Sequence, residues 1–161
     1  MQMAVDTIDR KIMALLQHDA SRSLSELGEA VALSPTPCWR RIQRLEKQGY
    51  IEKRVALLSR AKLNVGVTVF VMIRASHHSV EWLERFRQAV ADLPEILDIY
   101  RLSGDIDYLL RVAIPDIKAY DGFYQRLISR IELSDVSSMF AMEEIKSTTE
   151  IPLSYCGRGD P

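Results

Sequence analysis

Residues 23–47, SLSELGEAVALSPTPCWRRIQRLEK, decide the fold of the first third of the chain. Ser23 and Glu26 have the spacing of a capping box, which starts a helix, and Ser34 followed by a proline starts another helix. Only residues 32–33 separate the end of the first helix from the cap of the second. Helices joined this tightly must cross at a steep angle, so the stretch predicts a helix-turn-helix.

The residues on either side of this stretch extend the prediction. Asp6 can cap an earlier helix, in which Ile8 and Ile12 fall on one face. Gly49 is placed to end the last of the three helices. Residues 50–57 contain two short extended pieces around a charged pair, which predict either a wing or the start of a linking strand.

The last helix of the stretch has an apolar side and a basic side. Cys38, Ile42 and Leu45 point inward at helical spacing, which leaves most of the basic residues outside. Arginine and lysine neutralise phosphates, so the helix is predicted to read DNA; a solvated basic surface is the alternative, which the preceding tight turn disfavours. The predicted DNA-binding residues are Ser34, Thr36, Pro37, Trp39, Arg40, Arg41, Gln43, Arg44, Lys47, Lys53 and Arg54.

From residue 66 onward the pattern changes from helices alone to strands and helices. Residue periodicity predicts strands at 67–75, 96–103, 106–114 and 136–142 and helices at 81–93 and 116–131. This βαββαβ order is the ferredoxin-like split unit, so the fold class is α+β, a winged helix-turn-helix joined to a ferredoxin-like domain. Right-handed crossovers put both helices on one sheet face. The other face keeps apolar residues without a cover, which predicts self-association.

The two halves of the chain differ in charge. Residues 1–65 carry 11 Lys/Arg and 7 Asp/Glu, whereas residues 66–161 carry 10 and 15. The basic first half is suited to binding a polyanion, whereas the acidic second half is not and is expected to have another function.

Several classes of protein are not expected. The longest apolar stretch, residues 67–73, is far shorter than a membrane span, and the first residues lack the pattern of a signal peptide. The two cysteines, Cys38 and Cys156, lie far apart, which indicates neither a disulfide framework nor a zinc cluster. The cytoplasm is therefore the expected compartment.

Residues 103–108, SGDIDY, form the second candidate site. They fit a two-residue hairpin turn at 104–105, and they also fit a niche for a free amino acid. Carboxylates would pair with the ammonium group of that ligand, and backbone amides with serine hydroxyls would pair with its carboxylate. The residues concerned are Gly104, Asp105, Asp107, Ser137 and Ser138.

Two other features favour plain structural explanations. Cys38 lies in the first turn of a helix, where a redox-active thiol is an alternative, but its place on the apolar stripe favours a core residue. His77 and His78 would point to opposite sides of an extended chain, which disfavours a shared metal. The sequence has no P-loop, HExxH or GxSxG motif, so neither an enzyme nor a cofactor is expected.

Three blocks in this order resemble the leucine-responsive regulator/AsnC (feast/famine) family of transcription factors over about residues 4–153. The blocks are Asp6-x-x-Asp9-x-x-Ile12, residues 34–51 and residues 103–112, SGDIDYLLRV. Residues 77–82, HHSVEW, and 140–146, FAMEEIK, further resemble a branch that includes a cysteine-responsive detoxification activator.

The resemblance implies a regulator of amino-acid metabolism. Its C-terminal domain would dimerise through the sheet, assemble dimers into tetramers or octamers, and hold an amino acid between dimers near the hairpin loop. Cysteine is the first candidate, with leucine or methionine next. The implied effector contacts are Gly104, Asp105 and Asp107, with Tyr100, Ser103, Ser137 and Ser138 as neighbours.

The expected organisation is a DNA-binding domain at 1–53, a linker at 54–65, an effector and oligomerisation domain at 66–153, and a disordered tail at 154–161. Two alternatives remain at this point. One is an enzyme or enzyme-regulatory subunit that binds amino acids, which would have no use for the basic helix. The other is an architectural DNA-binding protein, which a base-specific footprint would exclude.

Overall fold

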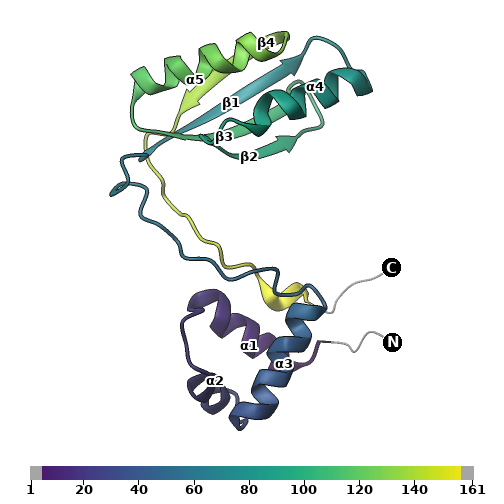
Figure 1. The fold of residues 1–161 in the computed structure, drawn as a ribbon, viewed down its shortest axis with the longest axis vertical. Coiled ribbons are helices and arrows are strands. Elements are labelled where there is room, and N and C mark those ends of the chain that lie inside the picture. Colours follow the sequence, from purple (N-terminus) through teal and green to yellow (C-terminus); the bar gives the residue numbers. More distant parts are fainter. Residues whose placement is uncertain (1–4, 157–161) are drawn as a thin grey trace. The chain divides into compact units, whose positions relative to one another are not determined.

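The computed structural model describes residues 5–156, and these residues divide into two compact units. The first unit comprises residues 5–56 together with 146–156, and the second comprises residues 57–145 (Figure 1). None of the helices in residues 5–156 is both long enough and apolar enough to cross a membrane.

The first unit is built on three helices, α1 (Thr7–His18), α2 (Leu24–Ala30) and α3 (Pro35–Lys47). Asp6 caps α1 and a capping box starts α2 at Ser23, as predicted. The cap of α1 is itself a capping box with Asp9, which was not predicted, and the side chain of Ser34 makes no cap hydrogen bond at α3. Their apolar faces meet in one core, made of Ile12, Met13, Leu16, Leu27, Val31, Cys38, Ile42 and Leu45.

The turn between α2 and α3 depends on a close backbone approach at Gly28. The Leu33 amide donates to the Gly28 carbonyl at 2.8 Å, and Ala32 adopts a φ of 56° to reverse the chain. A Cβ atom placed on Gly28 would lie 2.5 Å from the Leu33 carbonyl oxygen. The turn therefore has no room for a side chain at this position.

Replacing Gly28 with alanine is expected to destabilise the first unit, because the backbone of the turn must shift to accept the new methyl group. The cost is about 1–3 kcal/mol, the usual range for overpacking. Gly122→Ala is the matched control, since a Cβ there meets nothing within 4 Å and alanine favours the helix. Thermal unfolding followed by circular dichroism checks both variants, and equal melting points would contradict the expectation.

The connection after α3 is extended but is not a wing. Gly49, with a φ of 77°, ends α3 as predicted. Among residues 48–66 the structure contains no strand, so the strands expected at 50–57 are absent. Residues 50–57 have no partner strand among the described residues. The local sequence predicts an extended segment, but it does not show whether another strand is available to pair with it.

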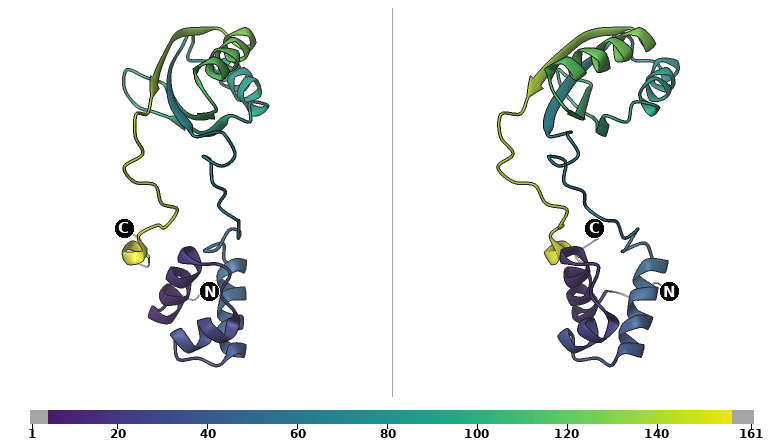
Figure 2. Two further views of the ribbon diagram at one scale, coloured as in Figure 1. Left: turned by 90° about the vertical axis from the view of Figure 1, so that its left-hand side faces the viewer. Right: turned by 60° about the vertical axis from the view of Figure 1, so that its left-hand side comes forward.

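The second unit is a four-stranded antiparallel sheet in the order β2-β3-β1-β4. The strands are β1 (Val67–Ala75), β2 (Ile96–Arg101), β3 (Tyr108–Ile114) and β4 (Leu133–Phe140). Helices α4 (Val80–Ala91) and α5 (Ile117–Arg130) lie on one side of the sheet, as Figure 2 shows. Between them and the sheet lies an apolar core that contains Phe86, Phe123, Leu127, Val71 and Leu110. This is the predicted βαββαβ unit.

Three details of the sheet differ from the prediction. The pairing register of β2 shifts between Ile96 and Asp98, so these residues do not share a face as simple alternation predicts. The connection from β2 to β3 spans residues 102–107, and is therefore longer than a two-residue turn. The last strand begins at Leu133, before the predicted residue 136, because its polar first residues still pair with the end of β1.

The face of the sheet away from the helices combines apolar and charged residues. Strand pairing places Tyr100, Leu109, Met72 and Ser137 in one row across it. The neighbouring row contains Phe70 and Met139 and an ion pair between Arg111 and Asp98. No helix of the second unit covers this face.

The C-terminal segment returns to the first unit. Residues 153–155 form a short 3-10 helix, and Leu153 and Cys156 pack against the core of the three helices. Residues 154–156 therefore differ from the disordered tail that we expected, because an apolar surface is available to them. The rest of that expected tail, 157–161, lies outside the described residues.

Candidate functional site

The outward surface of α3 carries the first candidate site. Cys38, Ile42 and Leu45 are buried, which turns the opposite side of the helix to solvent. The side chains exposed there are Thr36, Trp39, Arg40, Gln43 and Lys47. Trp39 is 48% exposed, a large aromatic group with no place in the core. Cationic, amide and aromatic groups on one exposed helix are suited to phosphates and base edges.

Two of the predicted DNA-binding arginines are engaged inside the unit. Arg41 Nη1 lies 2.6 Å from Asp6 Oδ2 and 2.8 Å from Asp9 Oδ1, and Arg44 Nη2 donates to the other oxygen of Asp9. The Asp9 side chain is fully buried. We call Asp6, Asp9, Arg41 and Arg44 the α1–α3 ion cluster. The cluster joins the first helix to the third. Arg41 and Arg44 therefore position α3 and are not free cationic groups on its outward surface.

The cluster also affects the titration of Asp6. The backbone amide of Asp9 and the guanidinium of Arg41 hold the pKa of Asp6 below its ordinary value of 3.8. A lowered pKa in the folded state means that Asp6 stabilises the unit above that ordinary value. The contribution is lost as the pH falls through the lowered pKa.

The remaining predicted DNA contacts lie at the two ends of α3. Ser34 and Lys53 are exposed, and Pro37 is half-buried. Arg54 pairs with Glu46 at 2.8 Å, so its charge is partly compensated. Lys53 remains available as a phosphate contact.

The loop at residues 102–107 is the second candidate site, and Asp107 fastens it to the end of β1. The Asp107 carboxylate accepts a hydrogen bond from the Ala75 amide at 2.8 Å, and its own amide donates to the Ile73 carbonyl at 3.0 Å. Arg74 Nε donates to the Asp105 carbonyl at 2.8 Å. Asp107 thus shapes the loop, while Ser103, Gly104 and Asp105 are exposed at its tip.

The other predicted effector residues lie on different sides of the sheet. Ser138 faces the helices and hydrogen-bonds the hydroxyl of Tyr120. Ser137, the next residue, faces the opposite side, in the same row as Tyr100. A strand cannot present consecutive side chains to one site, so Ser137 and Ser138 cannot serve one ligand from the same face.

A small cavity of about 150 Å³ lies beside the loop and was not predicted. His77, His78 and Arg101 line it together with the aromatic rings of Trp82 and Tyr108. His78 Nδ1 lies 3.7 Å from Asp107 Oδ1, which links the cavity to the loop. The only signal in the sequence is the pair of adjacent histidines, which we interpreted as polar side chains exposed to solvent.

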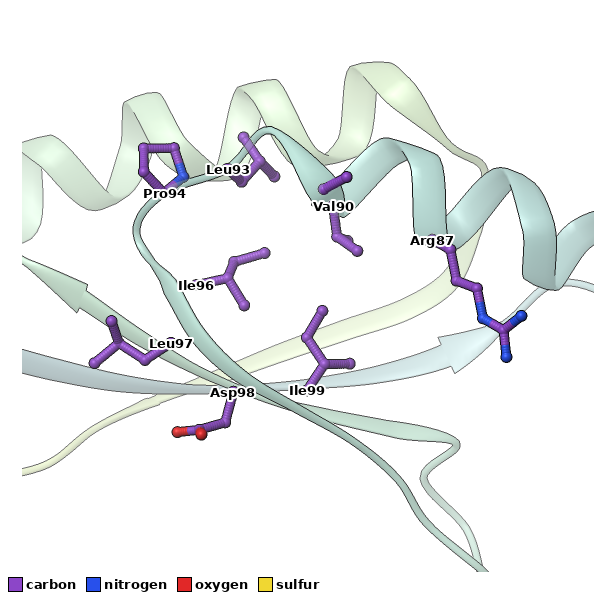
Figure 3. A pocket seen from close by; sticks show the side chains of 9 residues that line it. Arg87, Val90, Leu93, Pro94, Ile96, Leu97, Asp98 and Ile99 are labelled. Atoms are coloured by element: carbon purple, nitrogen blue, oxygen red, sulfur yellow. The ribbon is translucent and has the colours of Figure 1, made fainter. Parts of the chain in front are cut away.

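A second hollow of about 420 Å³ lies between α4 and β2 (Figure 3). Val90, Ile96 and Ile99 turn toward it, whereas Asp98 points to the other side of the strand. Its walls are mostly apolar and present few groups that could orient a polar ligand.

Cys38 is buried in the helix core, and burial raises the pKa of its thiol above the ordinary 9.0. A thiol in this state is unreactive, which favours the core role. Within residues 5–156, no three or more His, Cys, Asp and Glu side chains gather in a group that could hold a metal ion.

Both units match known protein families. Residues 5–46 match the AsnC-type helix-turn-helix domain, and residues 68–151 match the Lrp/AsnC ligand binding domain. The chain is 51% identical over 150 residues to the DNA-binding transcriptional activator DecR of Escherichia coli, covering 92% of this chain and 99% of that protein. It is 50% identical over 149 residues to the glutamate uptake regulatory protein of Zymomonas mobilis, covering 92% and 91% of the two chains.

Solved structures agree with these matches. An AsnC family transcriptional regulator from Agrobacterium tumefaciens is 57% identical, with a TM-score of 0.90 over 93% of this chain and 98% of that one. A transcriptional regulator from Neisseria meningitidis, solved as a complex with L-Met, is 36% identical, with a TM-score of 0.90 over 94% and 99%. The chain therefore belongs to the Lrp/AsnC family of DNA-binding transcriptional regulators.

Proposed function

We propose that this regulator binds specific DNA sites through α3 and that a free amino acid in the second unit modulates this binding. The observation that carries the proposal is the exposed row of Trp39, Arg40, Gln43 and Lys47 on a helix that an ion cluster around the buried Asp9 holds in place. A rigid helix with free cationic and amide groups suits the reading of bases in the major groove. Its place of action would be the cytoplasm.

The proposed effector site lies at the tip of the 102–107 loop. A bound amino acid needs partners for both of its charges, because desolvation of an unpaired charge costs several kcal/mol. Asp105 offers a carboxylate for the ammonium group, and Gly104, with a φ of 134° and open space around it, leaves the backbone accessible. Cysteine is our first candidate. Methionine comes next, since a relative was solved with L-Met, together with leucine.

The proposed assembly is a dimer formed through the uncovered sheet face, with dimers joined into tetramers or octamers. Phe70, Met72, Leu109 and Met139 lie on that face, and Met139 is 55% exposed. A two-fold pairing would remove these groups from water. A ligand that binds one assembly better than another would then shift the population and move the attached DNA-binding units.

Replacing Arg40 with alanine is expected to weaken specific DNA binding by about 1–3 kcal/mol, the value of a bidentate contact to guanine. Lys47→Ala should weaken all DNA sequences alike and reduce the salt slope by about one unit. Neither variant should change the melting point, because both side chains are exposed. Mobility-shift titrations on a selected site and on random DNA check this, and unchanged affinity of an Arg40/Lys47 double variant would contradict the assignment of α3.

Gly104→Val and Asp105→Ala are expected to abolish amino-acid binding at the loop while DNA affinity without ligand stays unchanged. Valine is strained at a positive φ, and alanine removes the partner of the ammonium group. Calorimetry with each of the twenty amino acids is the measurement, and the exposed Asp121→Ala is the control on α5. If wild type and both variants bind an amino acid equally, the site lies elsewhere; if wild type binds none, amino-acid sensing is wrong.

A further inference from the structure

The C-terminal segment is bound to α1 by contacts that resemble those of a ligand. Gln17 Nε2 donates to the Ile151 carbonyl at 3.1 Å, and Gln17 Oε1 accepts from the Ile151 amide at 3.1 Å. One side-chain amide thus satisfies both backbone groups of a single residue, as a neighbouring strand would. This arrangement recognises an extended peptide.

Three further contacts set the register of the segment. His18 Nδ1 lies 2.9 Å from the Glu150 carboxylate, and Arg10 Nη1 donates to the Cys156 carbonyl at 3.1 Å. Leu153 inserts between these points and packs against the helix core. Arg10 follows Asp9 directly, so the segment is fastened beside the ion cluster that positions α3.

The same segment is tied to the second unit by a short stretch of chain. The last backbone contact of the sheet in this direction is the Ala141 amide, which donates to the Thr68 carbonyl at 2.9 Å. Residues 142–149 form no helix or strand and are exposed, and such a stretch spans at most about 3.5 Å per residue. If the end of β4 moves away from α1 by more than residues 142–149 can span when extended, residues 150–156 must therefore be pulled.

We propose that residues 150–156 form a detachable strap, a peptide ligand of α1 carried on the chain itself, and that its attachment couples the amino-acid site to DNA binding. The proposal rests on the proposed function above. A tethered ligand experiences an effective concentration in the millimolar range, so even a weak contact is largely formed, yet it is released when its tether is pulled. Release would free Arg10 and Gln17 and loosen α1 next to the ion cluster.

The test compares full-length wild type with Gln17→Ala and Gln17→Glu. Alanine removes both bonds to Ile151, whereas glutamate keeps an acceptor and loses the donor. Gln88→Ala, the same change at an exposed position of α4 in the second unit, is the matched control. Hydrogen exchange at the Ile151 amide reports attachment directly, and DNA affinity is titrated with and without 1 mM L-cysteine or L-methionine as probes.

We expect exchange at Ile151 to be about tenfold faster in Gln17→Ala, with a smaller increase in Gln17→Glu and none in the control. The change in DNA affinity caused by the amino acid should fall to less than about half of its wild-type value, because the strap of the variant is already released before the amino acid is added. Two results in Gln17→Ala would overturn the strap proposal and leave the proposed function untouched. One is unchanged hydrogen exchange at Ile151, and the other is faster exchange with an unchanged effect of the amino acid on DNA affinity. A wild type that responds to neither probe would overturn the coupling and count against the proposed effector as well.

Discussion

Asp9→Ala is expected to unfold the first unit while the second unit stays folded. The substitution removes the buried carboxylate that Arg41 and Arg44 share and leaves two guanidinium groups without it. Removing one partner of a fully buried ion pair costs about 3–5 kcal/mol, and the partial exposure of both arginines together with the remaining Asp6–Arg41 pair puts Asp9→Ala at the lower end of this range. A unit of this size has little more stability than this, because small domains bury a smaller fraction of their surface than large ones do. DNA binding should be lost with the fold.

The two tryptophans allow this prediction to be measured one unit at a time. Trp39 lies in the first unit and Trp82 lies in the core of the second, so fluorotryptophan NMR gives one signal for each. In Asp9→Ala the Trp39 signal should move to its unfolded position at 25 °C, and the Trp82 signal should stay. Glu29→Ala, which removes an exposed carboxylate from α2, is the control. A native Trp39 signal in Asp9→Ala would show that the ion cluster does not hold the unit together.

Met72→Glu is expected to dissociate the proposed dimer. Met72 lies in the middle of the uncovered sheet face, between Leu109 and Ser137. In a two-fold interface each substitution occurs twice, so two unpaired charges would be buried. At about 3 kcal/mol for each charge, the dissociation constant should rise by about four orders of magnitude.

Light scattering at micromolar concentration measures this loss, and circular dichroism confirms that the sheet is intact. Val80→Glu places the same charge at the start of α4, where the side chain is 79% exposed, and should leave the assembly unchanged. If Met72→Glu retains the wild-type mass, the subunits associate through another surface. Because two half-sites are read together by a dimer, the dissociated variant should also bind DNA much more weakly.

Local patterns predicted most of the fold, because caps, glycines and residue periodicity act over a few positions. The cap at Asp6, the capping box at Ser23, the end of α3 at Gly49 and the bounds of β1 are confirmed. The site was harder to predict, because a basic residue on a helix looks the same whether it meets solvent or a distant carboxylate. Arg41 and Arg44, both predicted to contact DNA, pair with carboxylates of the first helix and its cap, which the sequence pattern could not reveal.

Two further differences have the same origin in contacts between distant residues. The shift in β2 depends on how Asp98 pairs with β3, so alternation along one strand could not reveal it. The order of residues 153–156 depends on a surface of α1 far away in the sequence. Asp9 is part of a motif that the sequence shows, but its partners, two arginines of another helix, are seen only in the structure.

The return of residues 150–156 to α1 has a consequence for the making of the protein. On the ribosome the three helices emerge early, but the residues that complete their unit emerge only after the whole of 57–145 has been made. Nascent domains otherwise tend to fold in order from the N-terminus. A half-made chain therefore carries DNA-reading helices without their final contacts, and the completed unit appears only together with the domain that controls it.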